Sequence, residues 1–131
     1  MQNSMTRKDT EMNTIKEIMF AVPAGVVTST FGQTNKCTHI KCSLYYSKGG
    51  YVGISNSVQR GYYISVCPVK LDGMLITSYA FSGAKKLIVP CERRSKGKEA
   101  EAVAIFDRDI VDLVKRVFPN AGINGDEHIA A

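Results

Sequence analysis

The sequence has no long hydrophobic run. No stretch of its 131 residues reaches the roughly 18 apolar residues that a membrane-spanning helix needs. The longest apolar stretch, from Ile18 to Val27, is broken by Pro23 and Gly25. No Ala-x-Ala cleavage site directly follows it, as a secretory signal would require. Asn-x-Ser/Thr acceptor sequences are also absent. We therefore expect a cytoplasmic protein that has no membrane partner.

Residues that commonly carry catalysis are scarce. Histidine occurs only as His39 and His128, and His39 with Cys37 or Cys42 is the one local pairing of a base with a nucleophile. Residues two apart on a strand share a face but are separated by about 6–7 Å, which is too far for direct proton transfer. The sequence contains neither a Gly-x4-Gly-Lys-Ser/Thr loop nor a Gly-x-Gly-x-x-Gly motif. We expect no enzymatic activity and no cofactor.

The cysteines and the acidic residues of the last third do not form a convincing metal site. Cys37, His39 and Cys42 offer soft ligands, but on a strand the two cysteines point to opposite faces and cannot chelate one ion. The carboxylates at 107, 109 and 112 are spread around a predicted helix, as on a solvated face. Without an export signal, reduced thiols are expected rather than disulfides. No bound metal is predicted.

Charge is distributed unevenly along the chain, whose formal net charge is +5. Residues 36–98 contain eleven Lys or Arg against two Asp or Glu, whereas residues 99–131 contain three against seven. A basic middle of this size attracts polyanions through long-range electrostatics. A solvated surface that keeps the protein soluble explains the same charges, so the pattern alone identifies no partner.

The length is suited to one domain. We expect a flexible N-terminus over residues 1–9, a single α+β domain over 10–119 and a flexible tail over 120–131. Apolar residues spaced by three and four from Met12 to Val22 predict an N-terminal helix over residues 10–22. The same spacing from Glu99 to Phe118, with acids early and Lys115 and Arg116 late, predicts a C-terminal helix.

The strongest strand signal is the run from Tyr62 to Val69, which is rich in β-branched and aromatic residues. Residues 37–46 alternate between apolar and polar, and Asp72-Gly73 is a hairpin signal followed by a returning strand over 74–81. Together they predict a three-stranded antiparallel meander. Pro68 lacks a backbone donor and is expected at a sheet edge or a bulge.

Residues 82–91 fit either a short helix that ends before Pro90 or a strand around Leu87 to Val89, and the helix is favoured. The predicted fold is therefore α+β: an antiparallel sheet of three to five strands, with the N-terminal helix and the C-terminal helix packed on one face.

Tyrosines alternate with basic residues on the predicted strands. Strand alternation places Lys41, Ser43 and Tyr45 on one face, where Tyr63 and Ser65 of the next strand join them. Exposed aromatic rings stack on the bases of single strands, and Lys and Arg neutralise the phosphates. Strand tyrosines also commonly half-bury their rings and expose only the hydroxyl. The predicted nucleic-acid-binding residues are Lys41, Tyr45, Lys48, Arg60, Tyr63, Lys70, Lys85 and Lys86.

The predicted function is non-enzymatic binding of single-stranded DNA or RNA through this basic, tyrosine-rich sheet face. The alternative is a protein-interaction or assembly module, which includes self-association into a homo-oligomer. Its contact surface would be the sheet edge near Pro68 or the methionine-rich first helix.

Three segments resemble small uncharacterised proteins of bacterial mobile elements and phages: Lys41 to Tyr51, Arg60 to Val69 and Ala80 to Leu87. The likeness is a pattern of tyrosines and glycines. It implies a host in which DNA-handling accessory proteins are common, and it carries no established activity to this chain.

Overall fold

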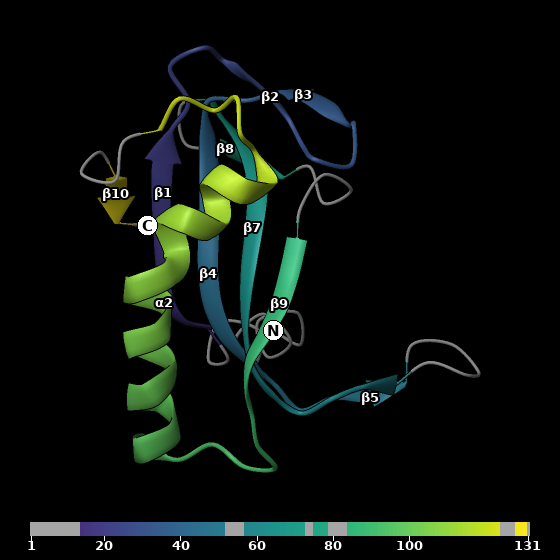
Figure 1. Ribbon diagram of the computed structural model, residues 1–131, viewed down its shortest axis with the longest axis vertical. Coiled ribbons are helices and arrows are strands. Elements are labelled where there is room, and N and C mark those ends of the chain that lie inside the picture. Colours follow the sequence, from purple (N-terminus) through teal and green to yellow (C-terminus); the bar gives the residue numbers. More distant parts are fainter. Residues whose placement is uncertain (1–13, 52–56, 73–74, 79–83, 124–127, 131) are drawn as a thin grey trace.

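The computed structural model describes residues 14–51, 57–72, 75–78, 84–123 and 128–130. They form a six-stranded antiparallel sheet, two short hairpins and one helix (Figure 1). The sheet has the order β10 (His128–Ala130), β1 (Thr14–Ala21), β4 (His39–Ser47) and β7 (Gly61–Asp72). Two further strands, β8 (Leu75–Ser78) and β9 (Ala84–Pro90), pair with different halves of the far edge of β7.

The two hairpins extend from opposite ends of the sheet (Figure 1). One consists of β2 (Val26–Thr28) and β3 (Thr34–Lys36), and the other of β5 (Gly50–Tyr51) and β6 (Ser57–Val58). The helix, α2 (Lys96–Val117), follows β9 and begins at the end of the sheet from which β5 projects.

β1 corrects the prediction of an N-terminal helix over residues 10–22. Residues 14–21 form a strand that pairs with β4 on one side and with β10 on the other. Ile18, Met19 and Phe20 are consecutive and all buried, because a strand inside a sheet can bury both of its faces. Such a run also satisfies helical spacing, so the periodicity alone was misleading. Residues 10–13 lie outside the described residues.

The predicted meander is confirmed, because β4, β7 and β8 are antiparallel neighbours. In β4, Ile40, Cys42, Leu44 and Tyr46 are buried while the residues between them are partly exposed. The sheet has six strands where three to five were expected, since β1 and β9 come from segments predicted as helices and β10 from the predicted tail.

β9 corrects the prediction of a short helix over residues 82–91, and the strand alternative is right from Ala84 to Pro90. The strand lies so close to β7 that a Cβ on Gly61 would come within 2.5 Å of the Val89 carbonyl oxygen. Glycine is therefore required where β7 begins.

Pro68 lies at a local sheet edge, as predicted. The pairing of β7 with β9 ends at Val66, and its pairing with β8 begins at Val69. On this side, Pro68 has no partner strand among the residues that the structure describes. The N–H group that proline lacks therefore costs no hydrogen bond between described strands.

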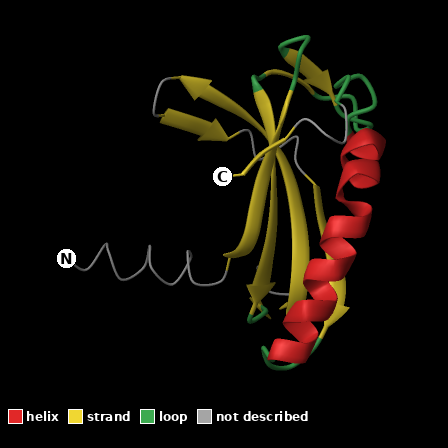
Figure 2. Cartoon of the chain, turned by 90° about the vertical axis from the view of Figure 1, so that its left-hand side faces the viewer, coloured by secondary structure: helices red, strands yellow, loops and turns green. Residues whose placement is uncertain are grey.

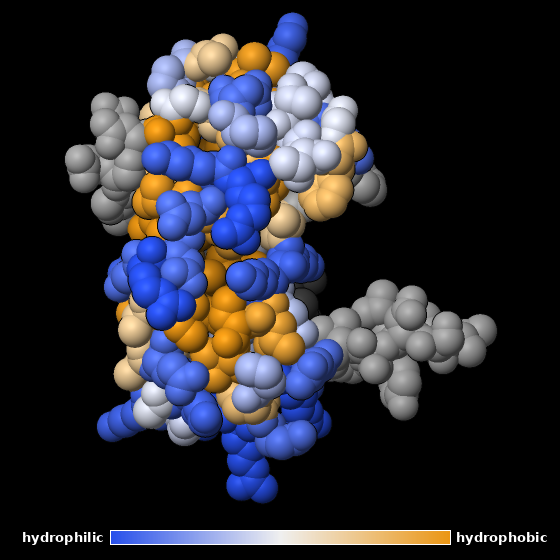
Figure 3. All heavy atoms as spheres, viewed as in Figure 1, coloured by the Kyte–Doolittle hydropathy of each residue, from blue (hydrophilic) through white to orange (hydrophobic). Residues whose placement is uncertain are grey.

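The C-terminal helix is confirmed as α2, and it packs on one face of the sheet (Figure 2). Ser95 caps it, because its side-chain oxygen accepts a hydrogen bond from the Lys98 backbone at 3.1 Å. The buried face of the helix consists of Ala102, Phe106, Ile110, Val114 and Val117. Hydrophilic side chains line its outer surface, and apolar ones show between α2 and β9 (Figure 3). Among the described residues, no helix is both long enough and apolar enough to cross a membrane.

The segment expected to be a flexible tail packs on the domain in its described parts. The Asn120 side-chain oxygen accepts a hydrogen bond from the Thr28 backbone at 2.8 Å, and Ala121 and Ile123 are buried. Residues 128–130 form β10, which pairs with β1. The predicted flexible N-terminus, residues 1–9, lies outside the described residues.

Candidate nucleic-acid interface

The face of the sheet away from α2, here called the open face, has no covering helix among the described residues (Figure 2). Its exposure is partial, because Met19 and Val69, which the register assigns to it, are buried. Residues directly opposite each other in an antiparallel ladder share a face, so the register assigns the side chains. Tyr45 lies opposite Tyr63, Ser43 opposite Ser65, and Ser65 opposite Lys85. The polar and aromatic side chains assigned to the open face include Glu17, His39, Lys41, Ser43, Tyr45, Tyr63, Ser65 and Lys85.

Tyr45 and Tyr63 form a stacked pair on the open face. Their ring centroids are 5.7 Å apart and their planes are inclined by 18°. Both residues are half-buried, and the Tyr63 hydroxyl donates a hydrogen bond to the Gln59 carbonyl oxygen at 2.6 Å. Burial, and secondarily the neighbouring Tyr63, raise the pKa of Tyr45, so its hydroxyl is uncharged at neutral pH. The pair is a fixed, neutral aromatic surface that is partly open to solvent.

A carboxylate lies beside these rings. Glu17 accepts a hydrogen bond from the Ser43 hydroxyl at 3.0 Å, and its carboxylate is 3.9 Å from the Lys41 ammonium. The side chains of Lys41 and Glu17 are 28% and 30% exposed, so both are accessible from the open face. Glu17 partly neutralises Lys41 and reduces the positive potential of this face.

The structure brings together four of the eight predicted binding residues and separates the others. Lys41, Tyr45, Tyr63 and Lys85 share the open face. Lys86 lies opposite Ile64, on the helix side, where it lines a cavity with Asp109 and Asp112. Lys70 lies an even number of residues from Ile64 on β7, so its side chain also points away from the open face. Lys70 and Lys86 therefore do not belong to a common surface with the tyrosine stack.

Lys48 and Arg60 lie at the end of the sheet, in what we call the basic pocket. Its volume is about 270 Å³, and its lining residues are Tyr46, Lys48, Arg60, Glu92, Arg93 and Arg94. Sequence reasoning missed Arg93 and Arg94, because residues 92–98, a link rich in Lys and Arg, lie between the predicted elements. The signal that could have identified them is Ser95, the next residue, because an N-cap serine fixes the chain where a helix begins.

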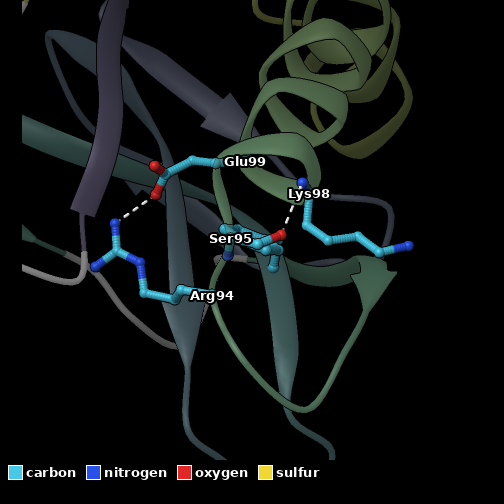
Figure 4. A network of polar contacts seen from close by, with 5 residues as sticks. Arg94, Ser95, Lys98 and Glu99 are labelled. Atoms are coloured by element: carbon cyan, nitrogen blue, oxygen red, sulfur yellow. Dashed lines mark hydrogen bonds and ion pairs between the residues drawn. The ribbon is translucent and has the colours of Figure 1, made fainter.

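Contacts at the start of α2 hold this link in place. Arg94 pairs with the carboxylate of Glu99 one turn into the helix, next to the Ser95 cap (Figure 4). The Ser95 backbone also donates to the Tyr62 hydroxyl at 3.4 Å. Arg93 is exposed and carries no ion pair with any described residue.

The cysteines, all of which lie in the described segments, are thiols. Burial, with a smaller contribution from Cys67, raises the pKa of Cys37 to about 11, and burial also raises the pKa of Cys42. Because the thiolate is the reactive form, both groups are poor nucleophiles and poor metal ligands at neutral pH. The described residues contain no cluster of three or more His, Cys, Asp or Glu that would hold a metal ion.

Comparison of the chain with protein-family models, with curated proteins and with solved structures gives no match.

Proposed function

We propose that this protein binds single-stranded nucleic acid along the open face and does so without catalysing a reaction. The observation that carries the proposal is the stacked pair of Tyr45 and Tyr63 on a sheet surface that no helix of the described residues covers. A nucleobase placed on the exposed side of such a pair extends an existing stack. The rings are already ordered, so less conformational entropy is lost on binding than for mobile side chains.

Stacking of one base on an aromatic side chain contributes about 1–3 kcal/mol and requires no particular base. That energy is large enough to position a nucleic-acid strand. Because it hardly depends on the base, it does not select a particular sequence. The proposed ligand is therefore a single strand of DNA or RNA with little sequence preference.

Charge on the same side of the molecule supports a polyanionic ligand. Lys41 and Lys85 share the open face with the stack, and Arg60 lies at its end. From Ile18 to Leu71 the sequence contains no acidic residue, so Glu17 supplies the carboxylate that we assign to this face. Lysines near a nucleic-acid strand neutralise its phosphates and release bound counterions. The binding affinity therefore falls as the salt concentration rises.

The experiment is a titration of labelled oligothymidylate with the full chain, followed by fluorescence anisotropy at several salt concentrations. Because the chain has no tryptophan, tyrosine emission serves as a second signal that base stacking quenches. Tyr45→Leu and Tyr63→Leu are each expected to weaken binding about tenfold or more, as loss of one stack implies.

The matched control is Phe31→Leu, which removes an aromatic ring that is 70% exposed on the β2–β3 hairpin, outside the proposed surface. It is expected to bind like the unchanged protein. Affinity that is insensitive to salt, or to both tyrosine substitutions, contradicts the proposal.

The second candidate function is a protein-interaction module, and Phe31 favours it. The turn that presents Phe31 is fixed, because the buried Ser29 hydroxyl accepts hydrogen bonds from the backbones of Phe31 and Gln33. Thr30 donates to the Val117 carbonyl oxygen at the end of α2. An exposed aromatic ring on a rigid turn suits a pocket on a protein partner. The methionine-rich helix first considered for this role is absent from residues 14–21, and Met19 is buried in β1.

Sedimentation of the protein in a lysate distinguishes the two functions. The interaction module predicts a complex that survives nuclease treatment and is lost in Phe31→Ser. Nucleic-acid binding predicts a complex that nuclease dissolves and that Phe31→Ser leaves intact.

A further inference from the structure

We infer that the basic pocket binds the terminal phosphate of a nucleic-acid strand. That the ligand is a nucleic-acid strand rests on the function proposed above. The affinity for a phosphate monoester rests on the pocket alone.

Three separate chain segments build the pocket. Tyr46 comes from the end of β4 and Lys48 directly follows that strand. Arg60 is the residue before β7, and residues 92–94 belong to the link between β9 and α2. They meet because Ser47 lies opposite Gly61, and Gly61 lies opposite Pro90, so the ends of three strands are adjacent. The pocket is thus a feature of the sheet's end and not of one flexible loop.

Its lining carries four cations and one carboxylate. Glu92 is 3.9 Å from Arg60, and its side chain is 90% exposed, so it points into solvent and screens little. Lys48 and Arg93 are exposed and have no ion pair among the described residues. The Tyr46 hydroxyl already donates to the Glu92 carbonyl oxygen at 2.9 Å and Arg94 is paired with Glu99, so Lys48, Arg60 and Arg93 are the donors offered to a ligand.

A phosphate monoester fits this charge better than a phosphodiester. The monoester carries about 1.5 to 2 negative charges at neutral pH and three acceptor oxygens, whereas an internal phosphate carries one charge. Arginine binds phosphate oxygens through paired donors, and such charge-assisted bonds are the stronger ones in proteins. The volume of about 270 Å³ lies just below the usual range for small-molecule pockets, so it accepts a phosphorylated end and not a large cofactor.

The basic pocket lies at the end of the sheet, with Tyr46 on the helix side, and residues 59 and 60 lead from it to the tyrosine stack. The Tyr63 hydroxyl is bonded to the Gln59 carbonyl oxygen, and Arg60 is the next residue. Gln59 and Arg60 line a neighbouring pocket of about 240 Å³ with residues 90–92, and Arg60 and Glu92 also line the basic pocket. In the inferred complex, a nucleic-acid strand whose bases stack on Tyr45 and Tyr63 passes Arg60 at the end of the sheet and places its terminal phosphate in the basic pocket.

The test compares one oligothymidylate with a 5′-phosphate, with a 3′-phosphate and with hydroxyls at both ends, titrated into the full chain. One phosphorylated form is expected to bind about tenfold more tightly than the hydroxyl form, as a charge-assisted hydrogen bond implies. Which end is preferred gives the direction of the strand. Arg93→Gln and Lys48→Gln are expected to abolish the preference, and both residues are exposed, so the variants should fold. Lys85→Gln is expected to weaken all three oligonucleotides equally and to keep the preference.

A second measurement separates this inference from the proposed function. Thermal unfolding is followed with thymidine 5′-monophosphate, thymidine 3′-monophosphate and thymidine. Stabilisation by either monophosphate but not by thymidine, lost in Arg93→Gln, supports the pocket even if no oligonucleotide binds. Equal affinity for phosphorylated and hydroxyl oligonucleotides, together with no effect of the monophosphates, overturns the inference and leaves strand binding on the open face intact.

Discussion

Tyr45 and Tyr63 stack across the β4–β7 ladder with their ring planes 18° apart, on the face that α2 does not cover. The adjacent cross-strand pair, Tyr46 and Tyr62, lies on the opposite face, and there the rings meet at 64° and are buried. Two cross-strand tyrosine pairs that are one residue apart in the ladder thus have different environments. One is part of the hydrophobic core, and the other is partly exposed to solvent.

The carboxylate of Glu17 should weaken any polyanion on the open face. Glu17→Gln keeps an acceptor for the Ser43 hydroxyl and removes the charge 3.9 Å from Lys41. We expect oligonucleotide affinity at low salt to rise about two- to fivefold, the scale of an exposed ion pair. Lys41→Gln should lower it. Fluorescence anisotropy gives both values.

The matched control for this charge change is Asp107→Asn. It removes one negative charge from the helix side, where Asp107 pairs with Lys16 at 2.6 Å. The net charge of the two variants is the same, so only a ligand on the open face distinguishes them. An equal rise in affinity for both would show that net charge, and not position, is responsible.

Gly61 cannot carry a side chain without displacing β9. In Gly61→Ala the new Cβ would lie 2.5 Å from the Val89 carbonyl oxygen, and the φ of 152° is unfavourable for alanine. We expect the free energy of unfolding to fall by about 1–3 kcal/mol, as overpacking usually costs. Urea denaturation measures this value.

Gly97→Ala is the control, because an added Cβ in the first turn of α2 meets no atom within 4 Å. It should stabilise the protein by about 0.5–1 kcal/mol, since alanine is the better helix residue. If both variants were equally stable, the close approach of β9 to Gly61 would be refuted.

The Ser95 cap should contribute measurably to stability. Ser95→Ala removes the acceptor of the Lys98 backbone N–H and is expected to cost about 1 kcal/mol. Ser95→Asp keeps an acceptor and adds a negative charge at the positive end of the helix dipole, so it should restore the loss. Thermal unfolding of the three proteins decides the matter, and an unchanged midpoint in Ser95→Ala would exclude the cap.

The buried thiols predict a loss of stability at alkaline pH. The folded state holds the pKa of Cys37 at about 11, above its ordinary value of 9.0, because burial disfavours the thiolate. The unfolded chain therefore releases this proton at lower pH than the folded one. The stabilising effect is complete below pH 9 and is lost as pH rises from about 9 to 11.

Urea midpoints measured at pH 8 and pH 10.5 test this sign, and Cys37→Ala should reduce the difference between them. Thiol alkylation at neutral pH gives a second test. Cys67 and Cys91, which are half-buried, should react before Cys37 and Cys42, and all four should react in denaturant. Higher stability at pH 10.5 would contradict the expected direction.

Local patterns were sufficient for the central strands and for the last helix. The alternation of residues 37–46, the hairpin signal at Asp72-Gly73 and the helical spacing of residues 99–118 depend on neighbours in the chain, so they can be read from it. The same alternation correctly placed Lys41, Tyr45 and Tyr63 on one face.

The failures occurred where neighbours in space decide the structure. Residues 14–21 and 84–90 satisfy helical spacing, but pairing with β4, β10 and β7 makes them strands, and the bonds that decide this come from distant segments. Lys70 and Lys86 shared a basic region with Lys41 in the sequence, and the register of β7 and β9 separated them from it.

The sequence by itself determined which side chains alternate, where the chain turns and where positive charge gathers, because these properties follow from residue type and spacing. Only the tertiary structure decided that the Tyr45–Tyr63 face lies away from α2 and that Lys48, Arg60 and Arg93 line one pocket. The reason is physical: the pocket forms where the ends of β4, β7 and β9 meet, and no local preference specifies which strands will pair.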